Sequence, residues 1–139
     1  MLIVGCGCRG RSLAATLVAE GHAVRGTTRR PEALSEISGS GAEAVIADPD
    51  RLGTILPLLG DVSVLAWLVG SSRLETLLER IVDTPVRGLV YDGADGAPLV
   101  PAASQRWRIP VAVVEEEESA HAAWLAAARA AVHAVLGQQ

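Results

Sequence analysis

Short apolar segments alternate along the chain with longer segments in which apolar residues recur at helical spacing. The short segments predict six strands, at residues 2–4, 22–27, 43–47, 62–69, 87–91 and 110–114. The longer segments predict five helices, at residues 11–20, 32–38, 51–59, 73–82 and 116–136. Residues 92–108 are rich in Gly, Pro and Ala and predict a loop with room for one helical turn.

The predicted strands are almost continuously apolar, which is typical of a parallel sheet that helices cover on both faces. The regular alternation of strand and helix indicates the same arrangement. Because crossovers between parallel strands are right-handed, few topologies remain. We therefore predict an α/β fold with one doubly wound parallel sheet, whose strand order is 3-2-1-4-5-6. No repeat, linker or second domain is visible, so residues 1–139 are expected to form a single domain.

Composition agrees with this fold and narrows the partners. The chain has 3 Trp, 1 Tyr and no Phe, so Val, Leu, Ile and Ala must form the core. No apolar run approaches the roughly 20 residues that span a bilayer, and no basic stretch precedes the first strand. We therefore expect no membrane segment, no signal peptide and a cytoplasmic location. A net charge of −4 without a basic stripe argues against nucleic acid as a main partner.

The first strand runs directly into a glycine-rich segment, GCGCRG, at residues 5–10. Gly5, Gly7 and Gly10 have the spacing G-x-G-x-x-G between a strand and a helix, the context in which this pattern binds a dinucleotide. The first glycine permits a tight turn, the second lets the backbone approach a diphosphate, and the third lets the helix pack closely on the strand. We therefore predict an NAD(P) site here. The alternative is a strand–helix turn whose glycines are coincidental.

The other side chains of this segment are also assigned to the cofactor site. Arg9 could bind a phosphate through two hydrogen bonds, as could Arg11, or each could be a solvated charge at the start of the helix. Cys6 and Cys8 stand where a small side chain suffices, and we favour this interpretation over redox chemistry or metal binding. The three histidines lack a spacing such as H-x-x-x-H, so no metal site is predicted.

The end of the second strand predicts which dinucleotide is bound. A site for NAD or FAD carries Asp or Glu there, because an acid accepts hydrogen bonds from the ribose hydroxyls. Here Thr28 holds that position, Arg29 and Arg30 follow, and the next acid is Glu32. A guanidinium binds a 2′-phosphate, which an acid would repel. NADP(H) is therefore favoured over NAD(H); the alternative is that both arginines are exposed charges before a helix.

These segments resemble the extended and atypical short-chain dehydrogenase/reductases, which implies a Rossmann fold; NmrA-like and epimerase-like NAD(P)-binding proteins are nearest in pattern. The resemblance is carried by residues 5–10, by GHAV at 21–24, by GTTRRPE at 26–32 and by VIADPD at 45–50. In that family an Asp after the third strand contacts the adenine, which implies this role for Asp48. A stretch after the fourth strand lines the cofactor ribose, and the matching residues are Ala66, Trp67 and Leu68.

The chain departs from that family at the positions that perform catalysis. Many members carry Ser near the end of the fifth strand and a Tyr-x-x-x-Lys pair beyond it, but here Asp92 follows Tyr91. All 12 Lys and Arg positions are Arg, so no catalytic lysine is available. No segment of these 139 residues resembles the family's substrate domain, so we expect the chain to lack it. The resemblance thus implies cofactor binding without the usual catalytic pair.

Three side chains at the carboxyl ends of predicted strands remain as catalytic candidates. Tyr91 could donate a proton to a carbonyl if a neighbour lowered its pKa, although a structural role is favoured. Asp92 lies beside it in the sequence. Glu115 follows the sixth strand, where it could face a nicotinamide or simply complement the dipole of the last helix.

Three functions are compatible with these observations. The first is a stand-alone NADP(H)-binding or redox-sensing module. The second is an NADPH-dependent oxidoreductase whose active site is completed by a partner subunit, or by Tyr91 and Asp92. The third is a vestigial Rossmann domain that serves as an interaction module. The exposed apolar area of so small a domain also favours a homodimer.

Overall fold

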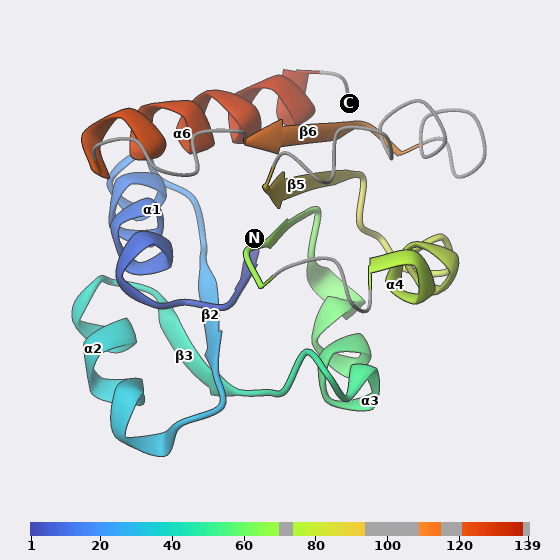
Figure 1. Cartoon of the computed structure of the whole chain (residues 1–139), viewed down its shortest axis with the longest axis horizontal. Coiled ribbons are helices and arrows are strands. Elements are labelled where there is room, and N and C mark those ends of the chain that lie inside the picture. Colours follow the sequence, from blue (N-terminus) through green and yellow to red (C-terminus); the bar gives the residue numbers. More distant parts are fainter. Residues whose placement is uncertain (70–73, 94–108, 115–120, 138–139) are drawn as a thin grey trace.

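The computed structural model describes residues 1–69, 74–93, 109–114 and 121–137 of the chain (Figure 1). Its strands are β1 (Leu2–Val4), β2 (Arg25–Thr28), β3 (Glu43–Ile46), β4 (Val64–Trp67), β5 (Gly88–Asp92) and β6 (Val111–Val114). Its α-helices are α1 (Cys8–Ala19), α2 (Leu34–Gly39), α3 (Leu52–Ile55), α4 (Leu74–Ile81) and α6 (His121–Gly137). Two 3-10 helices, Pro31–Ala33 and Leu56–Asp61, precede α2 and follow α3.

The strands of the described residues form one sheet in the order β3-β2-β1-β4-β5-β6, and every neighbouring pair is parallel. The predicted α/β class and strand order are therefore confirmed. In the central strand β1, Ile3 is paired with Gly26 of β2 on one side and with Ala66 of β4 on the other. The carboxyl ends of β1, β2 and β4 consequently lie together, at the point where the strand order reverses.

Helices cover both faces of this sheet (Figure 1). One core cluster joins α1, α2 and α6 to the sheet, and a second joins α3 and α4 to the opposite face. Alternation along β1 connects the two, because Ile3 belongs to the first cluster while Leu2 and Val4 belong to the second. All three side chains are fully buried, which explains the continuous apolar strand in the sequence.

Glycine determines where the first helix begins and ends. α1 starts at Cys8, three residues before the prediction, because Gly7 is its N-cap. At the other end Gly21 has φ of +94°, its N–H donates to the Val18 carbonyl, and the His22 N–H donates to the Leu17 carbonyl. This pair of bonds is a Schellman motif. Since His22 completes the helix end, β2 begins at Arg25 and the predicted start at residue 22 is wrong.

Proline explains one further difference, whereas the buried row of the last helix agrees with the helical repeat. The predicted helix at 51–59 is split, because α3 ends at Ile55 and a 3-10 helix that contains Pro57 follows. The spacing of apolar residues in the last helix predicts that Trp124, Leu125, Ala128, Val132 and Val135 face inward. In α6 all of these are buried except Leu125, which is half-buried. Neither α6 nor any other helix within the described ranges has the length and apolar character needed to cross a bilayer.

Candidate functional site

The loop between β1 and α1 is anchored to the neighbouring strand β2. The Gly5 N–H donates to Thr27 Oγ1 over 3.3 Å, and the Cys6 N–H donates to the Thr27 carbonyl over 2.9 Å. Gly5 has φ of +87°, and a Cβ at this position would lie 2.3 Å from Val69 Cγ1. Only glycine therefore fits there. The buried Thr27 and Gly5 together determine where the loop leaves the sheet.

The other two loop glycines have opposite surroundings. A Cβ at Gly10 would lie 3.1 Å from the Gly5 carbonyl oxygen and 3.4 Å from Ile3 Cγ2, so this glycine lets α1 pack closely on β1. A Cβ at Gly7 would meet no described atom within 4 Å. No described side chain caps the N-terminus of α1. The helix therefore begins with open space before it and with the positive end of its dipole directed there, an arrangement that attracts anions.

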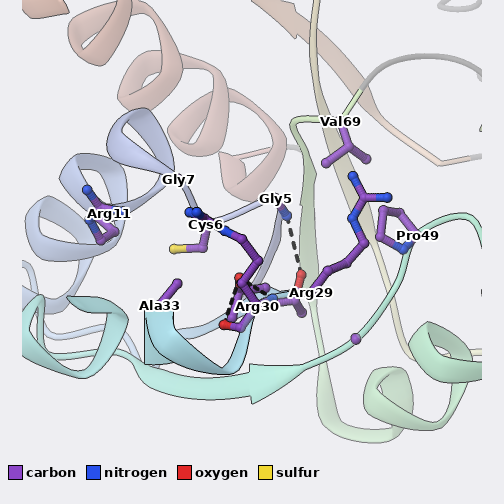
Figure 2. A pocket seen from close by; sticks show the side chains of 12 residues that line it. Gly5, Cys6, Gly7, Arg11, Arg29, Arg30, Ala33, Pro49 and Val69 are labelled. Atoms are coloured by element: carbon purple, nitrogen blue, oxygen red, sulfur yellow. Dashed lines mark hydrogen bonds between the residues drawn. The ribbon is translucent and has the colours of Figure 1, made fainter. Parts of the chain in front are cut away.

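A groove of about 260 Å³ adjoins this space (Figure 2). Its walls come from the glycine loop, from α1, from the end of β2, from the segments after β2 and β3, and from Val69 after β4. The lining residues are Gly5, Cys6, Gly7, Arg11, Thr27, Thr28, Arg29, Arg30, Ala33, Ala47, Pro49 and Val69. The groove thus lies outside the carboxyl ends of the strands, at the reversal of strand order, where ligands bind in such sheets.

Two consecutive arginines follow β2 and leave it in different directions. Figure 2 shows the Arg29 side chain directed toward Pro49 and Val69, and the Arg30 side chain directed toward the glycine loop. Nη1 of Arg29 lies 3.4 Å from Asp50 Oδ2 and 3.8 Å from Asp48 Oδ1. Arg30 has no ion pair within the part of the chain that is described. Of the two guanidinium groups, Arg30 is therefore the less constrained.

The predicted selector position carries a hydroxyl. Thr28 Oγ1 accepts a hydrogen bond from the Arg30 N–H over 3.1 Å and so shapes the turn after β2. None of the twelve lining residues is acidic. In the sequence Asp48 stands between two lining residues, Ala47 and Pro49, and its Oδ1 accepts a hydrogen bond from the Asp50 N–H over 2.9 Å. Its contact with an adenine stays a prediction.

The two cysteines of the loop have different environments. Cys6 is 4% exposed, and its Sγ would lie 2.6 Å from a Cβ added at Gly26, so its side chain fills the space between the loop and β2. Burial raises the pKa of the Cys6 thiol to about 11, and the charge of Arg11 opposes this rise. Cys8 is exposed at the start of α1, and neither cysteine forms a disulfide. Cys6 thus acts at the site through its packing and backbone.

Arg9 and Asp92, assigned to the cofactor and to catalysis, lie together outside the lining of the groove. The guanidinium of Arg9 is 5.2 Å from the centre of the Trp124 ring, and its Nη1 is 3.9 Å from Asp92 Oδ2. Asp92 Oδ1 accepts the indole N–H of Trp124 over 3.1 Å. Tyr91 is 1% exposed in the core beneath α3 and α4. Glu115 lies outside the described residues.

The stretch predicted to line the ribose is placed mainly in the core. Ala66 and Trp67 are 3% and 1% exposed, and the indole of Trp67 belongs to the cluster under α3 and α4. Leu68 is partly buried against the other cluster. Val69 lines the groove instead. A role for the first three residues near a ribose stays a prediction.

Sequence reasoning did not identify Thr27, Val69 or Pro49. Thr27 acts through its buried hydroxyl and carbonyl, and a threonine in a short strand gives no signal of this. The other two residues follow the strands β4 and β3, and contribute only by position. Within the described ranges, no group of three or more His, Cys, Asp or Glu is placed to hold a metal ion.

No protein-family model matches the chain, and no curated protein matches its sequence. Solved structures do share its fold. Triphenylmethane reductase from Citrobacter sp. superposes with a TM-score of 0.64 at 18% identity, over 82% of this chain and 47% of that one. A further structure of that reductase is a complex with NADP(H).

Two other structures extend the comparison. An NADPH-dependent quinone oxidoreductase from Escherichia coli gives a TM-score of 0.65 at 16% identity, over 82% of this chain and 46% of that one. A UDP-glucuronic acid 4-epimerase from Bacillus cereus, in complex with NAD, gives a TM-score of 0.61 at 13% identity, over 82% of this chain and 55% of that one. The chain therefore spans about half the length of these proteins. It has the Rossmann fold found in such NAD(P)-binding reductases and epimerases.

Proposed function

We propose that the protein binds NADP(H), with the diphosphate at the start of α1 and the adenosine ribose phosphate in the groove between Arg29 and Arg30. The observation that carries this proposal is that two features occur together in one groove. The loop of Gly5 and Gly7 borders open space at a helix N-terminus, and guanidinium groups line the same cavity. A dinucleotide with an additional phosphate on its ribose matches both features.

The charges of the groove favour the phosphorylated cofactor. An NAD site uses an acid at the end of β2 to accept the ribose hydroxyls, and Thr28 stands there. A phosphate monoester carries nearly two negative charges at neutral pH, and Arg groups bind it through paired hydrogen bonds. Binding of NADP(H) in preference to NAD(H) is therefore expected.

We further propose that the chain works as a stand-alone nucleotide-binding or redox-sensing module. Two catalytic candidates are already engaged elsewhere, since Tyr91 is buried in the core and both carboxylate oxygens of Asp92 have neighbours. The sequence has no lysine that could lower the pKa of a tyrosine. These facts support cofactor binding more strongly than proton transfer by this chain alone.

An NADPH-dependent oxidoreductase is the second candidate, with the active site completed by a partner or a second subunit. Its support is that the similar structures include reductases, two of which are described with NADP(H) or NADPH. Hydride transfer needs only a nicotinamide and a positioned acceptor. Oxidation of NADPH in the presence of quinones, aldehydes or ketones would establish this second function, and binding without oxidation supports the module.

Calorimetric titration of the purified chain with NADPH and NADH tests the binding proposal. We expect NADPH to bind at least about tenfold more tightly than NADH, because a hydrogen bond to a charged group contributes about that much affinity. Arg30→Ala should remove most of this difference. Arg80→Ala is the matched control, because Arg80 is an exposed arginine of α4 on the other face of the sheet. Equal affinity of the wild-type chain for the two cofactors would refute the preference, and no binding of either would leave the vestigial interaction module as the better account.

A further inference from the structure

A third arginine lines the groove, but a carboxylate outside the groove holds its guanidinium. Nη1 of Arg11, on α1, lies 3.0 Å from Glu36 Oε2 on α2, and Glu36 is not among the lining residues. The Arg11 side chain is 28% exposed and that of Glu36 is 57% exposed. The ion pair is therefore accessible both to solvent and to a molecule in the groove.

Arg11 also lies near Cys6, a residue that lines the groove. Its charge acts on the Cys6 thiol, where it opposes the rise in pKa that burial causes. In Figure 2, Arg11 stands on the α1 side of the groove, across from the segment that carries Arg29 and Arg30. A ligand phosphate that enters between them is approached by guanidinium groups from two elements of the fold.

The charges around the groove are balanced in the absence of a ligand. Three arginines line it, and three carboxylates lie 3.0 to 3.8 Å from two of those arginines. A phosphate must therefore compete with carboxylates for the guanidinium groups of Arg11 and Arg29. Exposed ion pairs are weak, whereas paired hydrogen bonds from Arg to phosphate are stronger, so the exchange is favourable.

We propose that Glu36 tunes cofactor specificity, because its carboxylate competes with the ribose phosphate of the nucleotide for Arg11. When the phosphorylated cofactor binds, the Arg11 guanidinium turns from α2 into the groove. A nucleotide without the ribose phosphate leaves the Arg11–Glu36 pair intact. This inference rests on the proposed function, since it requires a nucleotide phosphate in the groove.

Glu36→Gln is the informative variant, and Glu32→Gln is its matched control. Both remove one exposed acid from the segment after β2, but Glu32 has no ion pair within the described residues. The probes are adenosine 2′,5′-bisphosphate (2′,5′-ADP), adenosine 3′,5′-bisphosphate (3′,5′-ADP) and 5′-AMP, which differ only in the presence and position of the second ribose phosphate. We expect Glu36→Gln to bind 2′,5′-ADP about two- to fivefold more tightly, the range that loss of an exposed ion pair allows, and to bind 5′-AMP as the wild type does. Glu32→Gln should change both affinities by less than this.

A double-mutant cycle with Arg11→Gln assigns the effect to the pair. Arg11→Gln should weaken binding of 2′,5′-ADP, and adding Glu36→Gln to it should have no further effect. The inference fails if Glu36→Gln acts like Glu32→Gln, if it strengthens the binding of 5′-AMP equally, or if its effect persists without Arg11. If wild-type protein prefers 2′,5′-ADP but Glu36→Gln changes nothing, the proposed function stands and only this inference falls. If wild-type protein binds 5′-AMP as tightly as 2′,5′-ADP, both fall. Tighter binding of 3′,5′-ADP would overturn the NADP(H) assignment, while the cycle, repeated with that ligand, still decides the role of Glu36.

Discussion

The indole Nε1–H of Trp124 donates a 3.1 Å hydrogen bond to Asp92 Oδ1, which joins α6 to the carboxyl end of β5. Trp124 is fully buried, so this bond satisfies a polar group that water does not reach. The Arg9 guanidinium lies against the same ring and 3.9 Å from the other carboxylate oxygen. We infer that Asp92 positions these two side chains, and a catalytic role for Asp92 stays a prediction.

Removal of the Asp92 carboxylate should therefore lower the stability of the fold. Asp92→Leu leaves the buried indole N–H without an acceptor, which we expect to lower the free energy of unfolding by about 1–3 kcal/mol. Asp92→Asn keeps an oxygen at the same place and should cost less. Urea unfolding followed by circular dichroism measures both. If the two variants unfold at the same urea concentration as the wild type, the hydrogen bond contributes nothing to stability.

Two glycines of the same loop should respond differently to alanine. Gly5→Ala forces a side chain into a φ of +87° and against Val69, so we expect a loss of stability of at least about 1–3 kcal/mol. Gly7→Ala meets no described atom and has a φ of −79°, which any residue adopts, so the free energy of unfolding should change little. Its methyl group would instead occupy the space proposed for the diphosphate. NADPH affinity should then fall about tenfold or more, as a lost charged hydrogen bond implies.

Thermal unfolding and calorimetric titration of the two glycine variants separate the structural role from the binding role. A stable Gly7→Ala protein that binds NADPH as the wild type does would show that the open space is not the diphosphate site. A Gly5→Ala protein as stable as the wild type would contradict the role of Gly5 in the turn.

The alternation of short apolar runs with helical segments predicted the sheet order, and strands such as β1 and β4 are indeed continuous apolar runs. The same reasoning failed at the ends of helices and strands, because single hydrogen bonds determine the residue at which each element begins or ends. His22 belongs to the end of α1 because its N–H reaches the Leu17 carbonyl, and no hydropathy pattern records that bond. Pro57 is an intermediate case, because a proline disfavours a continuous helix, but only the fold determines where α3 ends.

The candidate site shows the same division. The glycines, Thr28 and the two arginines were identified from the sequence because each is tied to a fixed offset from β1 or β2. Side-chain direction could not be read in this way, because it depends on partners far along the chain. Arg9 lies against Trp124, and Trp67 lies in the core, although both were assigned to the cofactor. Whether their backbone groups contact a nucleotide stays a prediction.

The two thiols should differ in reactivity. Cys8 is exposed, whereas Cys6 is buried and its pKa is raised to about 11 from an ordinary value of 9.0. Because the thiolate is the reactive form, a disulfide reagent at pH 8 should modify one thiol of the native protein and both after unfolding. NADPH should slow the first reaction if the diphosphate lies at the start of α1. Cys8→Ser is the control and should leave no fast-reacting thiol; rapid modification of Cys6 would contradict its packing between the loop and β2.

The ion-paired Glu20 should give the stability a dependence on pH at the acidic end. Glu20 accepts a hydrogen bond from Arg129 Nε over 2.7 Å and lies 2.8 Å from His133 Nε2, which joins α1 to α6. The Arg129 hydrogen bond lowers the pKa of Glu20 below its ordinary value of 4.5; desolvation opposes this effect, and smaller contributions from His133 add to it. Since the folded-state pKa is the lower one, the stabilisation is present above pH 4.5 and is lost as the pH falls through the folded-state value.

The difference in unfolding free energy between wild type and Glu20→Gln should therefore shrink as the pH is lowered past 4.5. Glu79→Gln, which alters an exposed acid of α4, should show no such trend, and a Glu20→Gln difference that is constant with pH would contradict the ionic contribution.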